Sequence, residues 1–268
     1  MAVLEIEQND GIALVRLNRS EARNALNPEL IVALAACWEK LGMDDDIRVV
    51  VLSGAAGSTF CAGFDLSSFI PLFTGARAPA DDWDHAIVND PGLPGRATLR
   101  DFDLGKPLIV AANGHAMAGG MEMLLAGDLR VVATGARLGL PEVKLGLIPA
   151  MGGTARLPRL VSPALAAEML LTGNPIEADA ALAAGLVNYV VSAGKVEAVA
   201  LELAATIAAN APLAVKAARK VMRQGGDLSE AEALALESAE TAILVGTEDA
   251  REGPRAFMEK RPPVFKGR

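Results

Sequence analysis

The segment KPLIVAANGHAMAGGMEMLLAGDLRVVATGARLGLPEVKLGLIP, residues 106–149, sets the architecture that we expect for the whole chain. Five apolar residues at 108–112 lie between a proline and an Asn-Gly pair, which predicts a strand buried on both faces. Small residues follow up to Gly120, and residues 121–126 then show a helical pattern. A glycine-rich turn between a strand and a helix gathers free backbone N–H groups and the positive helix end. Such a point can hold a developing negative charge.

Two carboxylates accompany this turn. Glu122 lies one turn into the predicted helix, and a loop presents Glu142 after a predicted strand at 129–133. Two carboxylates in apolar surroundings can hold one water molecule, one accepting a proton while the other donates. A second small-residue turn, 60–66, can add a backbone N–H to an oxyanion hole, because small residues let a substrate approach the backbone. The residues predict a site that binds a carbonyl and moves a proton at its α-carbon.

Bulk composition restricts the partners. The chain has 268 residues, 51% of them hydrophobic, which suffices for one large core with or without an appendage. A net charge of -8 disfavours nucleic acid or an anionic membrane as the main partner. Cys37 and Cys61 form no recognised motif, and two histidines without a Cys/His cluster make a metal site improbable. The N-terminus lacks the features of a secretion signal, and no apolar run reaches membrane-spanning length. We therefore expect a soluble cytoplasmic protein.

The rest of the chain reads as strands and turns followed by helices alone. Residues 67–105 contain four prolines and four glycines, which predicts a long, partly irregular excursion, mobile or lid-like, that includes Trp83 and His85. We expect an α/β core over residues 1–195 and a C-terminal helical region over 196–268. Further strands are predicted at 3–7, 12–17, 47–53 and 186–191, with turns at 9–11 and 54–58, and helices at 28–41, 154–160, 163–171, 179–184, 196–209, 212–223, 229–244 and 249–260.

These motifs have a familiar spacing. The patterns NGx4GGxE at 113–122 and PEx3Gx2Px2GG at 141–153 resemble the enoyl-CoA hydratase (crotonase) superfamily. Similar motifs extend over nearly the whole chain: LNR and NAL within 17–26, FCAGFDL at 60–66 and EGx3FxEKR at 252–261. The resemblance implies an α/β spiral of ββα repeats with C-terminal helices that drive trimer formation, usually giving a hexamer of two trimers. It also implies a CoA thioester as substrate, with CoA as part of the substrate and no separate cofactor.

The resemblance assigns roles to four residues. The amides of Phe64 and Gly119 would bind the thioester oxygen, and Glu122 and Glu142 would be the catalytic pair. The implied reaction is reversible syn addition of water to the double bond of a 2-enoyl-CoA, as in fatty acid metabolism. Glu122 would act chiefly as base, and Glu142 would supply the α-carbon proton.

The same resemblance implies further substrate contacts, two of them from a neighbouring subunit. For Arg23 and Lys260, plain surface charge is an equal alternative. The contacts within one chain are Ala22, Arg23, Ala25, Ala62, Gly63, Asp65, Leu66, Gly120 and Pro141, and those from the neighbour are Phe257 and Lys260.

Departures from the family pattern leave the acyl group open. Ser20 stands where a proline is common, and Ala118 where a glycine is common, one residue before the proposed amide of Gly119. The excursion at 67–105 is long. Together with the basic tail at 260–268, it favours a carnitinyl-CoA dehydratase-like subgroup. A Δ3-Δ2-enoyl-CoA isomerase on the same fold is a further alternative. RNA binding would need a basic surface stripe, and a serine hydrolase would need a G-x-S-x-G elbow near a histidine.

Overall fold

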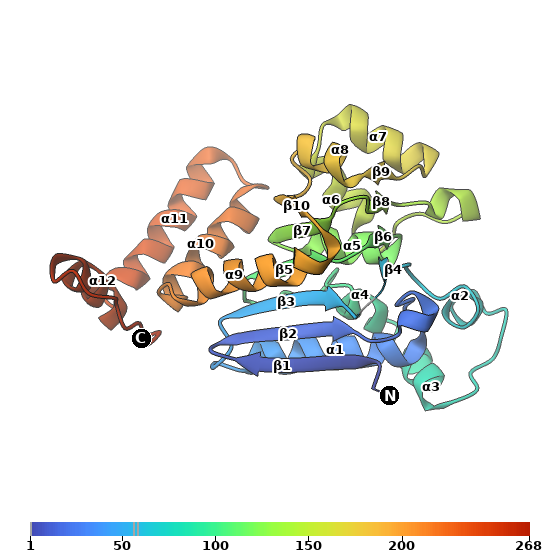
Figure 1. The fold of residues 1–268 in the computed structure, drawn as a ribbon, viewed down its shortest axis with the longest axis horizontal. Coiled ribbons are helices and arrows are strands. Elements are labelled where there is room, and N and C mark those ends of the chain that lie inside the picture. Colours follow the sequence, from blue (N-terminus) through green and yellow to red (C-terminus); the bar gives the residue numbers. More distant parts are fainter. Residues whose placement is uncertain (1, 56, 58) are drawn as a thin grey trace.

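Two β-sheets flanked by helices form the body of the protein (Figure 1). The computed structural model describes residues 2–55, 57 and 59–268, so residues 56 and 58 of the predicted turn at 54–58 lie outside the described residues. The larger sheet has the order β1-β2-β3-β5-β7-β10 and the smaller has the order β4-β6-β8-β9. Their bounds are β1 Leu4–Asn9, β2 Ile12–Leu17, β3 Val49–Gly54, β4 Thr59–Cys61, β5 Leu108–Ala112, β6 His115–Met117, β7 Leu129–Ala133, β8 Arg137–Gly139, β9 Ile176–Glu177 and β10 Tyr189–Val191.

The hairpin predicted at 9–11 is confirmed. Asp10 and Gly11 have φ values of 49° and 78°, the left-handed pair that a two-residue hairpin turn requires, and β1 and β2 are antiparallel with Asn9 opposite Ile12. The central strands β2, β3, β5, β7 and β10 then pair in parallel. Strands β3 and β5 are buried at every position, as their unbroken apolar runs predict.

Consecutive strands alternate between the two sheets. β3, β5 and β7 lie in the larger sheet, and each is followed by a strand of the smaller sheet, β4, β6 or β8. Each step therefore adds one parallel strand to both sheets, which makes the chain a spiral. This confirms the predicted α/β spiral. The spiral also places the chain reversals after β4, β6 and β8 side by side.

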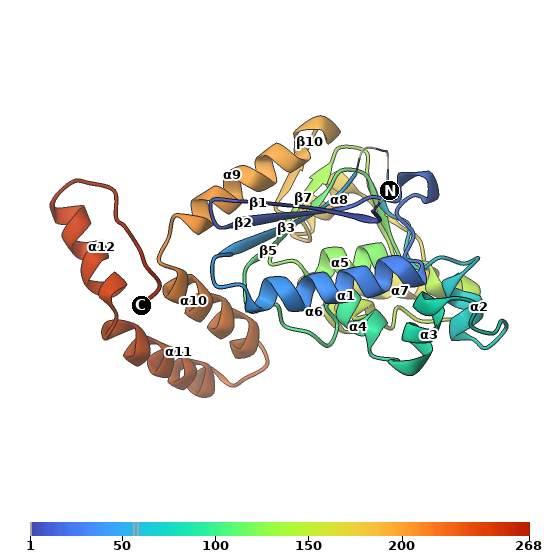
Figure 2. The same cartoon turned by 90° about the horizontal axis from the view of Figure 1, so that it is seen from below.

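Helices cover both faces of the larger sheet (Figure 2). α1 (Pro28–Met43) lies on one face and α9 (Val196–Ala208) on the other. Asn27 begins α1, because its side chain accepts a hydrogen bond of 3.0 Å from Leu30 N and Pro28 follows it at the first helical position. α9 buries Val196 and three alanines at four-residue spacing. The helix face that packs on the strands therefore carries mainly small side chains.

The excursion at 67–105 is more ordered than predicted. It contains α2 (Phe69–Phe73), α3 (Asp82–Asn89) and α4 (Leu93–Ala97), and α3 and α4 pack against α1. Helices of five to eight residues carry little periodic signal, and tertiary contacts stabilise them. Trp83 and His85, expected in a loop, are exposed on α3. No single helix in the described part of the chain is long and apolar enough to cross a bilayer; Ala193–Ala208 and Pro212–Gly225 meet the criterion only jointly, across a 110° bend.

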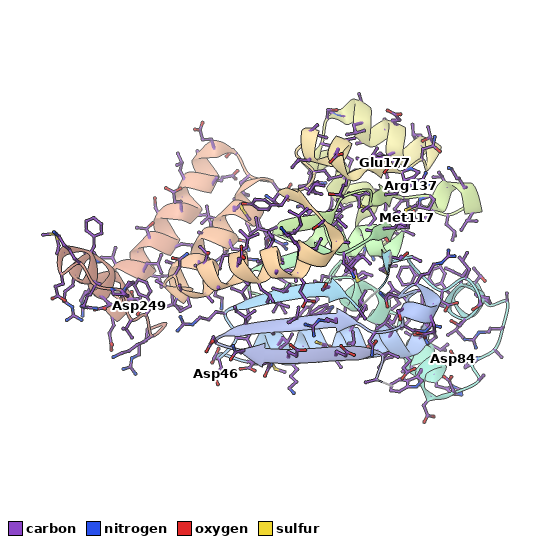
Figure 3. All side chains as sticks on the ribbon, in the orientation of Figure 1. Asp46, Asp84, Met117, Arg137, Glu177 and Asp249 are labelled. Atoms are coloured by element: carbon purple, nitrogen blue, oxygen red, sulfur yellow. The ribbon has the colours of Figure 1, made fainter. Side chains whose placement is uncertain are left out.

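The last helices stand apart from the layered core (Figure 1). Asp249 on α12 is buried and fixes the C-terminal tail (Figure 3), because its carboxylate accepts hydrogen bonds from Lys266 N at 2.7 Å and Gly267 N at 2.8 Å. The division of the chain at residues 195 and 196 stays a prediction, although α9 itself packs on the sheet. The remaining helices are α5 Gly119–Ala126, α6 Gly153–Leu160, α7 Pro163–Thr172, α8 Ala178–Ala183, α10 Pro212–Gly225, α11 Glu230–Val245 and α12 Glu248–Met258.

One ion pair ties the excursion together. Arg77 donates hydrogen bonds from both terminal nitrogens to Asp84, including Nη2 to Oδ1 at 2.7 Å, and from Nε to Ser68 O at 2.9 Å. Asp84 is buried (Figure 3), so its carboxylate depends on these partners and on Ala80 N. We expect Arg77→Ala to speed amide hydrogen exchange in α2 and α3 by about tenfold or more, with the sheets unchanged, because a buried carboxylate loses its cation.

The control for this prediction is Arg100→Ala, which removes an exposed ion pair to Asp101 of 3.3 Å. Exposed pairs contribute little, so exchange in α2 and α3 should stay at the wild-type rate. Equal protection in the two variants would contradict the role given to Arg77.

Candidate active site

Both predicted carboxylates line one cavity of about 290 Å³. The turn and helix at 64–73 form one wall, the segment 145–151 forms the opposite wall, and Ala118 lies at its base beside Glu122 and Glu142. The two glutamates come from different turns of the spiral, α5 and the segment after β8. The fold thus brings together the acidic side chains that the sequence analysis singled out.

Glu122 is held rigidly in the interior. Its side chain is 1% exposed, and Oε1 accepts hydrogen bonds from Met151 N at 2.7 Å and Gly153 N at 2.9 Å. Burial raises the pKa of this carboxyl to about 6, because desolvation outweighs the two hydrogen bonds, which favour the ion. With Oε1 occupied by two donors, Oε2 is the oxygen that remains for chemistry.

Glu142 begins a short 3₁₀ turn, Glu142–Leu145, after Pro141. Its Oε2 is buried and has no hydrogen-bond partner among the described residues. Burial, and then the negative charge of Glu122, raise the pKa of Glu142 to about 7. A buried carboxyl oxygen without a partner, beside a second carboxylate in the same cavity, is the arrangement expected of an acid that exchanges protons with a ligand.

The two predicted amide-bearing turns are in contact. Leu26 pairs with the first turn through Leu26 N to Gly63 O at 2.8 Å and Asp65 N to Leu26 O at 3.0 Å. In such a bridge the N–H of the residue between, Phe64, points away from Leu26. A Cβ placed on Gly63, whose φ is +96°, would lie 3.1 Å from Gly119 N. The backbone of Gly63 and Phe64 therefore approaches the start of α5, where Gly119 has one of the helix's unpaired N–H groups.

Glycine is required at this approach for space as well as conformation. A Cβ on Gly120 would lie 2.3 Å from Cys61 O, and a Cβ on Gly119 would lie 3.1 Å from the ring of Phe64. Ala118, the departure from the family pattern, has φ 49° and ψ −124°, a conformation that costs a residue with a Cβ about 1–3 kcal/mol. Its methyl group lies against Gly63 and lines the cavity, so it narrows the base.

The loop at 19–25 is joined to the first turn by Asp65. This buried carboxylate accepts hydrogen bonds from Arg19 Nη1 at 2.9 Å and from Ser67 N at 2.9 Å and Oγ at 2.6 Å. Burial opposes ionisation, but the hydrogen bonds from Ser67 and Arg19 prevail and lower the pKa of Asp65 to about 2. Asp65 is thus occupied by protein groups. Ala62 N donates to Arg23 O at 3.1 Å, which places Ala22, Arg23 and Ala25 beside this turn.

The other predicted contacts lie at varying distances from the cavity. Leu66 lines its rim and is 61% exposed. Phe257 is 82% exposed near the end of α12, and Lys260 follows that helix, so neither lines this cavity (Figure 1). Their contact with a substrate in a neighbouring subunit stays a prediction.

Three residues that support the site were not singled out from the sequence. The amides of Met151 and Gly153 hold Glu122, and Arg19 holds Asp65. In the sequence, the Gly-Gly pair at 152–153 belongs to a family motif and precedes a predicted helix, which does not predict its contact with Glu122. A Cβ on Gly153 would lie 3.1 Å from Glu122 Oε1. That close approach explains the glycine, and no local pattern indicates its partner.

Neither histidine belongs to the cavity. His115 Nδ1 accepts a hydrogen bond of 2.9 Å from Arg137 N, and His85 is exposed on α3. Across the described residues, no group of three or more His, Cys, Asp or Glu side chains is arranged to hold a metal ion. The chemistry available in the cavity is that of two carboxyl groups and backbone amides.

Comparison with known proteins agrees over the whole chain. The family model described as enoyl-CoA hydratase/isomerase matches residues 7–268. The chain is 39% identical to 2,3-dehydroadipyl-CoA hydratase of Escherichia coli K12 over 100% of both chains, and 38% identical to (E)-benzylidenesuccinyl-CoA hydratase of Thauera aromatica over 98% of both. It is also 37% identical to carnitinyl-CoA dehydratase of Salmonella typhi over 99% of this chain and 98% of that relative.

Solved structures match as closely. The crystal structure of enoyl-CoA hydratase from Mycobacterium tuberculosis H37Rv has a TM-score of 0.87 and 35% identity, covering 100% of both chains. The enoyl-CoA hydratase from Bacillus anthracis has a TM-score of 0.88 and 33% identity, covering 99% of this chain and 100% of the other.

The raised pKa of Glu142 predicts a pH-dependent change in stability. A carboxyl whose folded pKa lies above its unfolded value stabilises the fold below the unfolded pKa, and this contribution is lost as pH rises through about 7. We expect Glu142→Gln to exceed the wild type in free energy of unfolding by about 1–2 kcal/mol at pH 8, allowing for partial solvent exposure, and to equal it at pH 4. Urea unfolding at both pH values measures this difference.

The matched control is Glu168→Gln, which neutralises an exposed glutamate on α7. Its stability should follow that of the wild type within about 0.5 kcal/mol at both pH values. A Glu142→Gln variant less stable than the wild type at pH 8 would contradict the cause given for the raised pKa.

Proposed function

Because the chain belongs to the enoyl-CoA hydratase/isomerase family, we propose that it is a hydro-lyase that adds water reversibly, on one face, to the double bond of a 2-enoyl-CoA thioester. One observation carries the proposal: two glutamates with raised pKa values line the same cavity. The reaction needs a base for water and an acid for the α-carbon, and each carboxyl suits one of these tasks.

The protonation states match the order of events. With a pKa of about 6, Glu122 is mostly ionised at pH 7 and accepts a proton from water through Oε2 as the water oxygen bonds to the β-carbon. With a pKa of about 7, Glu142 retains a proton in about half of the molecules and donates it to the α-carbon. The pair exchanges protons as a unit, and dehydration is the reverse.

Two backbone amides serve as the oxyanion hole in this proposal. As the β-carbon is attacked, negative charge moves to the thioester oxygen, and the N–H groups of Phe64 and Gly119 stabilise it. Gly119 adds the positive end of α5. Support comes from the close approach of Gly63 to Gly119 N and from the Leu26 bridge, which directs the Phe64 N–H away from Leu26.

The proposal extends to the partners. CoA enters as part of the substrate, no separate cofactor takes part, and the loop at 22–25 lies along its path. We also propose a homotrimer or a hexamer of two trimers, with Phe257 and Lys260 contacting the substrate of a neighbouring subunit. Support comes from α11, which buries no residue within one chain and exposes Leu234, Ile243 and Val245. We place the protein in the cytoplasm, where the buried free cysteines Cys37 and Cys61 would stay reduced. A role in fatty acid metabolism would follow from the proposed reaction.

The first test of function removes each carboxylate separately. Glu122→Gln keeps an oxygen for the Met151 and Gly153 amides, so the fold should persist while hydration of crotonyl-CoA falls by about 10²-fold or more. Glu142→Gln should lose activity to a similar extent, and Glu168→Gln should lose none. The assay follows the gain of one water by mass spectrometry.

Outcomes of this assay separate the alternatives. Full activity in either active-site variant would refute the roles assigned. A product with a shifted double bond and no added water would identify the isomerase instead, and hydration of crotonobetainyl-CoA alone would identify the carnitinyl-CoA dehydratase alternative.

The pKa values predict a narrow pH optimum. Below about pH 6 Glu122 becomes protonated and cannot act as base, and above about pH 7 Glu142 loses the proton that it must donate. We therefore expect kcat/KM to pass through a maximum between these values and to fall by about tenfold per pH unit well outside them. Initial rates in constant-ionic-strength buffers from about pH 5 to pH 9 measure this profile, and a plateau across that range would contradict it.

A further inference from the structure

The wall of the cavity beyond the two glutamates is apolar. Among the described residues, Glu122 and Glu142 supply the charged or polar side chains that line it, and the rest of the lining is aliphatic, aromatic or alanine. No lysine, arginine or histidine of the described chain lines this space. A negatively charged substrate group would therefore enter without an ion-pair partner, and the acidic partners that the described residues offer a cation, Glu122 and Glu142, lie at the reacting centre.

Three phenylalanine rings form a stack that leads from the reacting centre to the surface. Phe64 and Phe69 have ring centroids 4.7 Å apart at an interplanar angle of 26°, and Phe69 and Phe73 have centroids 5.8 Å apart at 19°. Phe64 is the residue whose amide faces the thioester oxygen in the proposed function, Phe69 is 2% exposed and Phe73 is 60% exposed. The stack thus extends the apolar lining from the proposed thioester site to an exposed ring, that of Phe73.

The opposite wall continues this apolar surface. Leu145 and Ile148 line the cavity and are 59% and 63% exposed. Met151 also lines it, and its own backbone N–H donates the hydrogen bond to Glu122 Oε1. Large apolar side chains on both sides of an opening are typical of a site that buries an apolar ligand. An acyl group that reaches Phe73, Leu145 and Ile148 would cover these exposed apolar side chains.

The stack also argues against a cationic acyl group. Attraction between a cation and an aromatic ring requires access to the ring face. Phe69 stacks with both Phe64 and Phe73 and is 2% exposed, so it offers a cation little access to its ring face. An anionic acyl group would meet the charge of Glu122 and Glu142 instead. Both charged classes pay a desolvation cost that the wall does not repay.

We propose that the acyl group bound here is uncharged, apolar and long enough to reach Phe73, so that the natural substrates are 2-enoyl-CoA thioesters of medium chain length. This inference rests on the proposed function for the position of the thioester. It departs from the charged acyl groups named in three relatives that are 37–39% identical: carnitinyl-CoA dehydratase, 2,3-dehydroadipyl-CoA hydratase and (E)-benzylidenesuccinyl-CoA hydratase.

The test is a substrate panel on the full-length protein. We expect kcat/KM to rise by at least about tenfold from crotonyl-CoA to octenoyl-CoA, since each buried methylene adds to binding, and to be at least about tenfold lower for crotonobetainyl-CoA and 2,3-dehydroadipyl-CoA than for octenoyl-CoA. Phe73→Ala and Leu145→Ala should each lower the ratio of octenoyl to crotonyl activity severalfold. The control Leu171→Ala alters a leucine on α7 that is 79% exposed and outside the cavity, so this ratio should not change.

Binding of saturated thioesters separates this inference from the proposed function. By calorimetry, octanoyl-CoA should bind at least about tenfold more tightly than butyryl-CoA, and Phe73→Ala should reduce that difference. Tighter octanoyl-CoA binding without hydration of any thioester would overturn the proposed function and leave the acyl inference standing. Hydration without preference for chain length, or with preference for a charged acyl group, would overturn the inference and leave the hydratase standing.

Discussion

The contact on which the site depends is the pair of hydrogen bonds from the Met151 and Gly153 amides to Glu122. A carboxylate that is 1% exposed needs such donors to remain ionised near neutral pH. Both donors belong to the segment that follows Glu142. The two hydrogen bonds therefore fix the side chain of Glu122 and also tie it to the segment that carries Glu142. It also leaves Oε2 of Glu122 free. The same two hydrogen bonds thus position the Glu122 side chain and stabilise its negative charge.

A second constraint is the absence of side chains where the two amide-bearing turns meet. Gly63, Gly119 and Gly120 each lie where a Cβ would press on the other turn or on its flanking strand. Parallel strands β4 and β6 bring these turns to the same edge of the small sheet. The spiral thereby brings glycines far apart in sequence to one point, which is the oxyanion hole of the proposed function. Asp65 and Arg19 then anchor the first turn to the loop at 19–25.

A structural feature can be predicted from the sequence when neighbouring residues cause it, and is missed when distant residues do. The hairpin at Asp10 and Gly11, the start of α1 at Asn27 and the long helices follow from nearest-neighbour chemistry and were predicted within a few residues. The strands β4, β6, β8 and β9 have two or three residues each, too few to show a period, and were missed. The two glutamates of the cavity could be singled out because carboxylates in apolar segments are rare. Their amide donors were not, since the partner of Gly153 is set by tertiary structure alone.

In the proposed function, the parts of the fold that would perform chemistry are separate from those that would contact the acyl group. The glutamates and amides lie at the ends of sheet strands or on α5, where the surrounding core is closely packed. The apolar walls come from α2 and from the segment after Glu142, which lie outside the two sheets. Arg77 and Asp84 hold the chain between α2 and α3 by an ion pair of its own, away from the glutamates. Side chains such as Phe73 and Leu145 can therefore change without moving a reacting group, which is a physical reason why relatives that are 37–39% identical over nearly their whole length have names that specify different acyl groups.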